Sequence, residues 1–308
     1  MTLCLRTCTN CMGEIHGLQT LSAVEDAVVV ESCAIYKVRE LFTLLKESAQ
    51  STGEADITAF MTWIFTLPNV TLRENVMEDP HDFLVPLWQF MSMAGGDCYD
   101  QCGESCAYRQ LHLKMMNIGV NVAHQYECTT CRGRWLRHIN GYEWCVSLSL
   151  PSQGQISVDT LLHTHCSEGV VDVVDSRYCS CSSVDTVYTA RMRKIFSMSD
   201  ASQGKGVSIL ANNVYFGNDG RTYKYTDRYC VPSLDINIGG RAYTLSSFIE
   251  HRPLSSSSIN SAEVGHYVAY VRLSEDGLVW KVANDGVEEL RTWGQVAGVH
   301  GHLFFYTE

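Results

Sequence analysis

The stretch that decides the fold is Val264-Gly265-His266-Tyr267-Val268-Ala269-Tyr270-Val271-Arg272. Its β-branched and aromatic residues predict a strand over 266–273 that begins at His266. A strand is a rigid mount for a side chain, and Gly265 in front of it lets another backbone approach closely. In this setting His266, one of 11 histidines, is a candidate general base.

A second strand is expected over 278–283, where it would form a hairpin with the first. The segment Trp280-Lys281-Val282-Ala283-Asn284-Asp285-Gly286 places two polar side chains at the end of that strand. A papain-type protease needs a thiolate, a histidine that activates it and a polar residue that orients the histidine. We therefore expect Asn284 or Asp285 to reach the His266 ring across the hairpin.

The rest of the chain after residue 120 also has a β pattern. Gly217-Asn218-Asp219-Gly220 has the composition of a hairpin turn. Other strands are expected over 186–197, 206–216, 233–238, 241–246 and 301–306. A half-buried strand is indicated by the alternation of Trp144, Val146, Leu148 and Leu150 with Cys145, Ser147 and Ser149.

Before residue 120 the apolar residues recur at helical spacing. One helix has a clear start, because Asp79 can cap it, Pro80 suits its first position and Asp82 favours its first turn. Helices first and strands second predict an α+β fold. The other helical stripes are Ile15, Leu18, Leu21 and Val28; Val38, Leu41, Leu44 and Leu45; and Ile57, Phe60, Met61 and Ile64.

Composition excludes several classes of function. The chain has 308 residues, 45% of them hydrophobic, and a net charge of −11, which argues against nucleic acid as a partner. No apolar run reaches the length of about 18 residues that a transmembrane helix requires. The first residues lack the layout of a signal peptide, so we expect no membrane segment in this chain.

The 14 cysteines include two close pairs that are far apart in sequence. Four thiolates at such spacing are typical of a structural zinc site in a reducing compartment, so we expect a cytoplasmic protein. Disulfides or a redox C-x-x-C motif are the alternatives. The expected zinc ligands are Cys128, Cys131, Cys179 and Cys181, with His163, His165 or Cys166 as candidate replacements. Cys98, Cys102 and Cys106 either form a second metal site or are free thiols.

The segment Gly265 to Val287 closely resembles the histidine box of ubiquitin-specific proteases. The resemblance extends through Glu78 to Leu84, Val207 to Phe216 and His302 to Tyr306. It implies a USP-like, papain-type cysteine protease fold in a single domain over 1–308. The implied parts are a helical thumb (1–120), zinc-binding β fingers (121–200) and a β palm that carries the histidine box (201–308).

The nucleophile implied by this resemblance is Cys11, in Thr9-Asn10-Cys11-Met12 at the start of a helix that would lower its thiol pKa. Cys8 is the alternative. Arg6 stands where the family has an amide that binds the oxyanion, so Asn10 or backbone N–H groups would take that role. By register from Trp280, Asn284 falls on the family's orienting position and is the preferred candidate, whereas Asp285 fits the related viral pattern.

The implied function is deubiquitination, which is hydrolysis after the C-terminal Gly-Gly of ubiquitin or a ubiquitin-like protein. The tail would thread a channel beside Gly265, and loop 252–263 would gate it. The C-x-x-C plus C-x-C arrangement also resembles coronavirus-type papain-like proteases, which would add a viral polyprotein as substrate and the host cytoplasm as location. The alternative function, suggested by the altered nucleophile motif, is a catalytically impaired scaffold that binds ubiquitin or another protein.

Overall fold

The computed structural model divides into two compact units, Met1–Met116 and Asn117–Glu308. The residues that it describes are 40–41, 43–44, 47, 56–65, 79–84, 119–128, 134–167, 170–173, 189–197, 206–216, 222–225, 227–253 and 265–308.

The described part of the first unit is helical. In α5 (Thr58–Phe65), Phe60 and Ile64 lie four residues apart on one face and are buried. They form a small core with Leu41, Met61, Trp63 and Phe83. Ile57 does not join this core as its predicted stripe implied, because it precedes the helix and is 41% exposed. The stripe over 15–28 lies outside the described residues.

The predicted helix start at Asp79 is confirmed. Residues 80–84 are helical, and the Asp79 side chain accepts a hydrogen bond of 2.8 Å from the backbone N–H of His81. The Asp79 carbonyl accepts the first intrahelical bond, from Phe83 N–H at 3.2 Å. The Asp79 side chain therefore satisfies one donor, the His81 N–H, that a helix N-terminus otherwise leaves unpaired.

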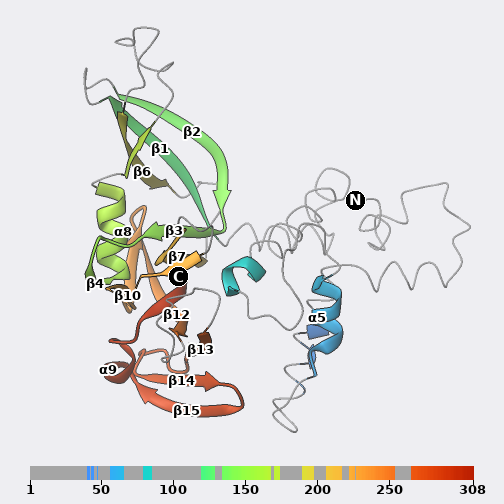
Figure 1. Cartoon of the computed structure of the whole chain (residues 1–308). Coiled ribbons are helices and arrows are strands. Elements are labelled where there is room, and N and C mark those ends of the chain that lie inside the picture. The colour runs from blue at the N-terminus through green and yellow to red at the C-terminus, as the bar shows by residue number, and fades with distance from the viewer. Residues whose placement is uncertain are drawn as a thin grey trace, which may run out of the picture. The chain divides into compact units, whose positions relative to one another are not determined.

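The second unit is built on β-sheets (Figure 1). A ten-stranded sheet runs in the order β15-β14-β13-β12-β16-β10-β4, with β11 pairing with β12, and β7 with both β16 and β3. A four-stranded sheet, β2-β1-β6-β5, forms a long ribbon at one end of the unit (Figure 1). We call it the finger sheet.

The bounds of these elements follow the chain. The first half holds β1 (Val120–Cys128), β2 (Arg134–Glu143), β3 (Cys145–Ser149), β4 (Gly154–Ser157), α8 (Val158–Ser167), β5 (Val170–Val173), β6 (Thr189–Ser197), β7 (Gly206–Asn212) and β8 (Val214–Phe216). The second half holds β9 (Thr222–Lys224), β10 (Arg228–Val231), β11 (Asp235–Ile238), β12 (Arg241–Pro253), β13 (Gly265–Arg272), β14 (Val279–Asn284), β15 (Val287–Thr292), α9 (Trp293–Val296) and β16 (Gly301–Thr307).

One hydrophobic core lies against the ten-stranded sheet. The alternation predicted for β3 is confirmed, because Val146 and Leu148 are fully buried whereas Ser149 is exposed. Phe248 stacks on Tyr270 of the next strand, with ring centroids 4.5 Å apart. Trp280 is also fully buried, and its indole N–H donates to the Gly277 carbonyl at 2.8 Å. This core fixes β12, β13 and β14 relative to one another.

Two strands differ from their predicted bounds. The single strand expected over 206–216 is two strands, because the chain turns at Asn213 and β8 pairs with β9 instead of continuing β7. The hairpin expected around 217–220 is confirmed by that antiparallel pairing, although the turn itself lies outside the described residues. The strand predicted over 241–246 continues to Pro253, so 252–253 belong to β12 and not to the expected loop.

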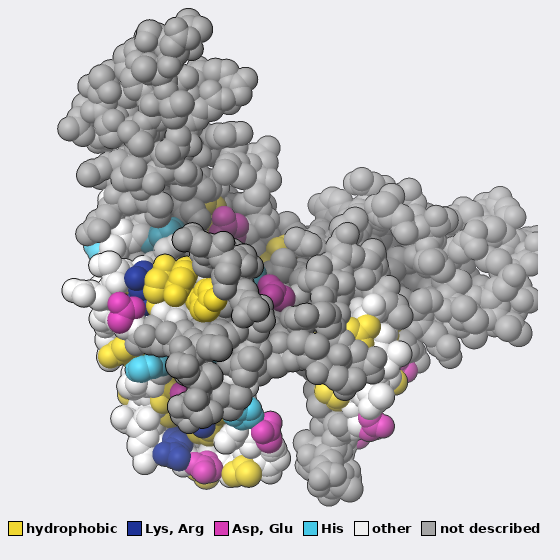
Figure 2. All heavy atoms as spheres, in the orientation of Figure 1, with side chains coloured by type: hydrophobic (Ala, Val, Ile, Leu, Met, Phe, Trp, Pro, Cys, Tyr) yellow, Lys and Arg dark blue, Asp and Glu magenta, His cyan; other side chains and the backbone are white. Residues whose placement is uncertain are grey.

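In the part of the chain that the structure describes, none of the helices combines the length and apolar character needed to cross a membrane. Where side chains are described on the face seen in Figure 2, acidic and basic groups lie interspersed. The net charge of −11 is therefore not gathered into one acidic patch on the described part of that face.

Candidate active site

His266 is the second residue of β13, with β12 on one side and β14 on the other. The predicted hairpin of β13 and β14 is confirmed, and its register pairs Ala269 with Ala283. Asn284 therefore stands opposite Val268 and shares the sheet face of His266, two residues away. Diagonal neighbours on one face are within reach of long side chains.

The His266 ring meets both predicted orienting residues. Its Nε2 atom lies 2.5 Å from the Asn284 side-chain oxygen Oδ1 and 3.6 Å from Asp285 Oδ2. Only the first is within hydrogen-bonding distance. The His266 side chain is 34% exposed, whereas that of Asp285 is 88% exposed. A carboxylate so accessible to water interacts weakly with an imidazole.

The chain turns sharply directly after Asn284. Asn284 pairs with Val287, so Asp285 and Gly286 form a two-residue hairpin loop, with φ of 48° and 45°. These left-handed values are those of a type I′ turn, for which Asp-Gly is a preferred sequence. The turn fixes Asn284 as the last residue of β14 and carries the Asp285 side chain outward.

This geometry assigns the two nitrogens of the His266 ring. The Asn284 oxygen can only accept a hydrogen bond, so Nε2 carries the proton of the neutral ring. The lone pair is then on Nδ1, which has no hydrogen bond to another described residue. His266 can thus accept a proton at Nδ1 while Asn284 holds the opposite side of the ring.

Gly265 is required by the neighbouring strand. A side chain at this position would place its Cβ 2.2 Å from Nε2 of His251 and 2.6 Å from the carbonyl oxygen of Arg252. His251 in turn packs on Tyr267, with ring centroids 4.6 Å apart, and Tyr267 lies 6.3 Å from the His302 ring. We call His251, Tyr267 and His302 the aromatic cluster. It lies on the opposite sheet face from His266, because His251 pairs with Tyr267.

Several residues near His266 were not found from the sequence. Lys224 Nζ lies 2.7 Å from His251 Nδ1 and donates to the His251 carbonyl at 3.2 Å. Arg252, Glu250 and Tyr270 form a hydrogen-bonded group on the His266 face. The alternation of Glu250, His251 and Arg252 would have revealed both faces had the strand been extended beyond residue 246.

Other predicted site residues lie outside the described residues or have no described side chain. The proposed nucleophile Cys11, its neighbour Asn10 and the alternative Cys8 are outside the described residues. So are Arg6 and the zinc candidates Cys131, Cys179 and Cys181, and Cys128 is described only as the last residue of β1. The catalytic and zinc assignments of these residues remain predictions, as do the roles of Cys98, Cys102 and Cys106.

The finger sheet brings the connections that carry the cysteine pairs to one end. Cys128 pairs with Ala190 of β6, and Val173 of β5 pairs with Thr189 beside it. The connections 129–133 and 174–188 therefore both leave the sheet at this end. This topology fits a four-thiolate zinc site shared between them.

The candidate replacement ligands lie on α8. Cys166 packs against the main core and His165 is buried, whereas His163 is exposed. Among the described side chains, no group of three or more His, Cys, Asp and Glu residues is arranged to hold a metal ion.

Comparison with known proteins shows what this fold resembles. No protein-family model matches the chain. Ubiquitin carboxyl-terminal hydrolase 26 of Arabidopsis thaliana is 23% identical over 279 residues, which are 87% of this chain and 23% of that protein. The chain therefore spans less than a quarter of the length of this curated relative.

Solved structures of the SAGA DUB module are also similar. A module of a Ubp8 point variant with Sgf11, Sus1 and Sgf73, bound to monoubiquitin, contains a chain that matches with a TM-score of 0.60 and 17% identity, over 96% of this chain and 62% of that one. The Ubp8/Sgf11/Sus1/Sgf73 module bound to ubiquitin aldehyde matches with a TM-score of 0.58 and 15% identity, over 90% and 59%. The chain has a USP-like DUB fold.

Proposed function

We propose that this chain is a cysteine-type deubiquitinase that hydrolyses isopeptide or peptide bonds after the C-terminal Gly-Gly of ubiquitin or a ubiquitin-like protein. The observation that carries the proposal is the contact of His266 Nε2 with Asn284 Oδ1 on a USP-like fold. The names of the similar proteins add support, because one is a ubiquitin carboxyl-terminal hydrolase and two complexes contain ubiquitin or ubiquitin aldehyde.

In the proposed reaction, His266 Nδ1 takes the proton of the Cys11 thiol, and the thiolate sulfur attacks the carbonyl carbon after Gly-Gly. The imidazolium then gives its proton to the leaving amine as the carbon–nitrogen bond breaks. Water, deprotonated by the same nitrogen, hydrolyses the thioester and restores the thiol. Asn284 holds Nε2–H throughout and thereby keeps the ring in one orientation. Asn10 and backbone N–H groups would bind the oxyanion.

The Gly-Gly tail would run along the His266 face of β13, because His251 and the Arg252 carbonyl fill the space on the other side of Gly265. The aromatic cluster packs against one face of β13 and His266 occupies the other. Two residues without side chains can approach the β13 backbone beside His266 more closely than larger residues can. The segment 254–263, the undescribed remainder of the expected gate, precedes Val264 and Gly265 in the sequence.

Zinc is proposed as a structural cofactor held by Cys128, Cys131, Cys179 and Cys181. A site closed by four thiolates has no open position for water, so the metal would cross-link the end of the finger sheet and take no part in hydrolysis. Thiolate ligands and a free thiol nucleophile are typical of a reducing compartment, so we propose a cytoplasmic location. A viral origin and a viral polyprotein substrate stay predictions from the cysteine spacing.

A fluorogenic substrate with an amide at the ubiquitin C-terminus tests the proposal. Wild-type protein should release the fluorophore, and Cys11→Ala or His266→Ala should lower the rate by at least about 1,000-fold. Cys8→Ala is the matched control and should retain activity. Tight ubiquitin binding without turnover by wild-type protein would contradict the enzyme and favour the scaffold.

A further inference from the structure

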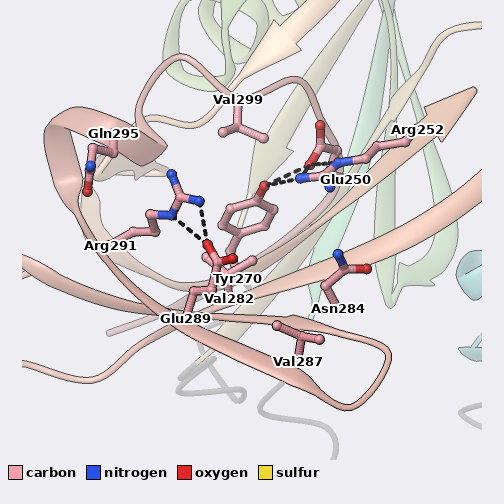
Figure 3. A pocket seen from close by; sticks show the side chains of 10 residues that line it. All are labelled: Glu250, Arg252, Tyr270, Val282, Asn284, Val287, Glu289, Arg291, Gln295 and Val299. Atoms are coloured by element: carbon pink, nitrogen blue, oxygen red, sulfur yellow. Dashed lines mark hydrogen bonds and ion pairs between the residues drawn. The ribbon is translucent and has the colours of Figure 1, made fainter. Parts of the chain in front are cut away.

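A groove crosses the sheet face that carries His266 (Figure 3). Glu250 and Arg252 of β12, Tyr270 of β13 and Asn284 of β14 line one part of it. Across the groove, β15 contributes the pair Glu289 and Arg291. The groove therefore contains two acid–arginine pairs, of which only one adjoins His266.

Arg252, Glu250 and Tyr270 form a closed hydrogen-bonded triangle, drawn as dashed lines in Figure 3. Arg252 donates to Glu250 Oε2 through Nε at 2.9 Å and to the Tyr270 hydroxyl oxygen through Nη2 at 3.0 Å. The Tyr270 hydroxyl donates to Glu250 Oε2 at 2.7 Å. A guanidinium can only donate and a carboxylate can only accept, so the hydroxyl has one consistent role.

The chemistry of the triangle keeps it intact near neutral pH. Burial, and then the hydrogen bond to Glu250, raise the pKa of Tyr270 to about 12, so its hydroxyl remains a donor. The hydrogen bond to Glu250 also raises the pKa of Arg252. The Glu250 side chain is 16% exposed and that of Arg252 is 44% exposed, so water screens the carboxylate less than it screens the guanidinium.

The triangle adjoins His266 through the strand register. Arg252 pairs directly with His266, and Glu250 pairs with Val268, so both share the His266 face. Directly opposed side chains have Cβ atoms roughly 5 Å apart. An uncompensated guanidinium at this position would oppose protonation of the His266 ring.

The other described charged and titratable groups near this face begin with His300, whose pKa is influenced by Glu250. Asp285 Oδ2 lies 3.6 Å from His266 Nε2, and Asn284 is neutral. Arg291 donates to Glu289 at 3.1 Å across the groove, and Gln295 of α9 is neutral. The ion pair of Lys281 and Glu288 lies on the opposite face, as does Lys224 against His251.

We propose that Glu250 and Tyr270 hold Arg252 so that its charge is compensated beside His266, which makes all three positioning residues for the catalytic base. The proposal rests on the proposed role of His266. The hydrogen bond from Arg252 to the Tyr270 hydroxyl links β12 to β13, the strand that carries His266. Glu250 supplies the opposite charge that leaves the ring able to accept the proton of the nucleophile.

Two substitutions test the charge balance because they must act in opposite directions. Glu250→Gln leaves Arg252 uncompensated and should lower the pKa of His266 by about 0.5. Arg252→Gln leaves Glu250 uncompensated and should raise that pKa by a similar amount. The His266 pKa is read by NMR titration of ring-labelled histidine in the full chain, with the signal assigned by its loss in His266→Gln.

The matched controls are Glu289→Gln and Arg291→Gln, which break the second pair in the same groove. They should change the His266 pKa by less than half as much as the Glu250 and Arg252 substitutions. Tyr270→Phe removes the hydroxyl without changing a charge, and should lower kcat several-fold with little change in KM and in the His266 pKa. The acid limb of the kcat/KM profile should move with the pKa in the two charge variants.

Shifts of the same sign in Glu250→Gln and Arg252→Gln, or shifts no larger than those of the controls, would overturn the triangle proposal. The titration needs no catalytic activity, so it decides this question even if wild-type protein hydrolyses nothing. Absence of turnover by the wild-type protein would contradict the proposed function, but it would leave the proposal about the triangle standing.

Discussion

At the scale of single residues, the contact of His266 with Asn284 distinguishes Asn284 from Asp285 as the residue that orients the imidazole ring. Asn284 accepts a hydrogen bond from Nε2 at 2.5 Å, whereas Asp285 lies at 3.6 Å and is 88% exposed. Asn284→Ala should therefore lower kcat on the order of 100-fold, because the ring loses its fixed orientation. Asp285→Ala should lower it less than about five-fold. A larger loss in Asp285→Ala would reverse the assignment of the orienting residue.

Gly265 makes a separate prediction about stability. Gly265→Ala places a Cβ against the His251 ring and the Arg252 carbonyl, and should lower the free energy of unfolding by about 1–3 kcal/mol. Gly294→Ala is the control, because a Cβ at Gly294 meets nothing within 4 Å. Urea denaturation measures both. Equal stabilities of the two variants would show that β12 can move away from Gly265.

The candidate site could be predicted only in part from the sequence. The hairpin, the position of His266 and the two candidate orienting residues followed from strand periodicity and from the polar residues that follow Ala283. The preference for Asn284 over Asp285 was made from the register with Trp280, and the left-handed turn that directs Asp285 outward gives its structural reason. The triangle was missed because the end predicted for β12 was seven residues too early, at 246 instead of 253. Mixed polar residues such as Glu250 and Arg252 carry little strand signal of their own.

At the scale of elements, the finger sheet is the part whose stability should depend on metal. Its two cysteine-bearing connections leave the same end, beside Cys128 and Thr189. Removal of zinc with a chelator should increase hydrogen exchange in β1 and β6, and leave β13 and β14 protected. The same changes are expected in Cys179→Ser, with loss of the bound zinc.

Cys145→Ser provides the control for losing a thiol, since Cys145 lies in β3 of the other sheet. It should keep one zinc per chain. Full zinc content in Cys179→Ser would refute the proposed ligand set.

The fold at this scale was predicted best where periodicity was strong. β3, β13, β14 and β16 lie within a residue or two of their predicted ranges. The division of 206–216 into β7 and β8 was missed, although Asn212 and Asn213, a residue type depleted in strands, interrupt the apolar run. The pairing of β8 with β9 confirms the break at Asn213.

At the scale of the whole molecule, His300 should make a small contribution to the loss of stability in acid, because its exposed side chain is only partly desolvated. Partial desolvation, opposed by Glu250 and reinforced by Lys224, lowers the pKa of His300, whose ring centroid lies 3.7 Å from that of Tyr229. The His300 imidazole therefore binds a proton more tightly in the unfolded chain than in the folded one. Its contribution to the free energy of unfolding is present above a pH of about 6.5 and is lost as the pH falls below that value.

Chemical denaturation between pH 8 and pH 5 measures this effect. His300→Phe keeps an aromatic ring against Tyr229 but cannot titrate, so its free energy of unfolding should fall less steeply with acid than that of wild type. Identical slopes in the two proteins would exclude His300 as a contributor.

The central claim is that a USP-like fold carries a working cysteine protease site with Cys11 and His266 as its reactive pair. The most direct measurement is reaction of the chain with ubiquitin that bears a C-terminal electrophile, followed by peptide mass spectrometry. The account predicts one covalent adduct, on Cys11, which is lost in Cys11→Ala and strongly reduced in His266→Ala. Wild-type protein that binds the probe tightly and forms no adduct, or an adduct on another cysteine that survives Cys11→Ala, would contradict it.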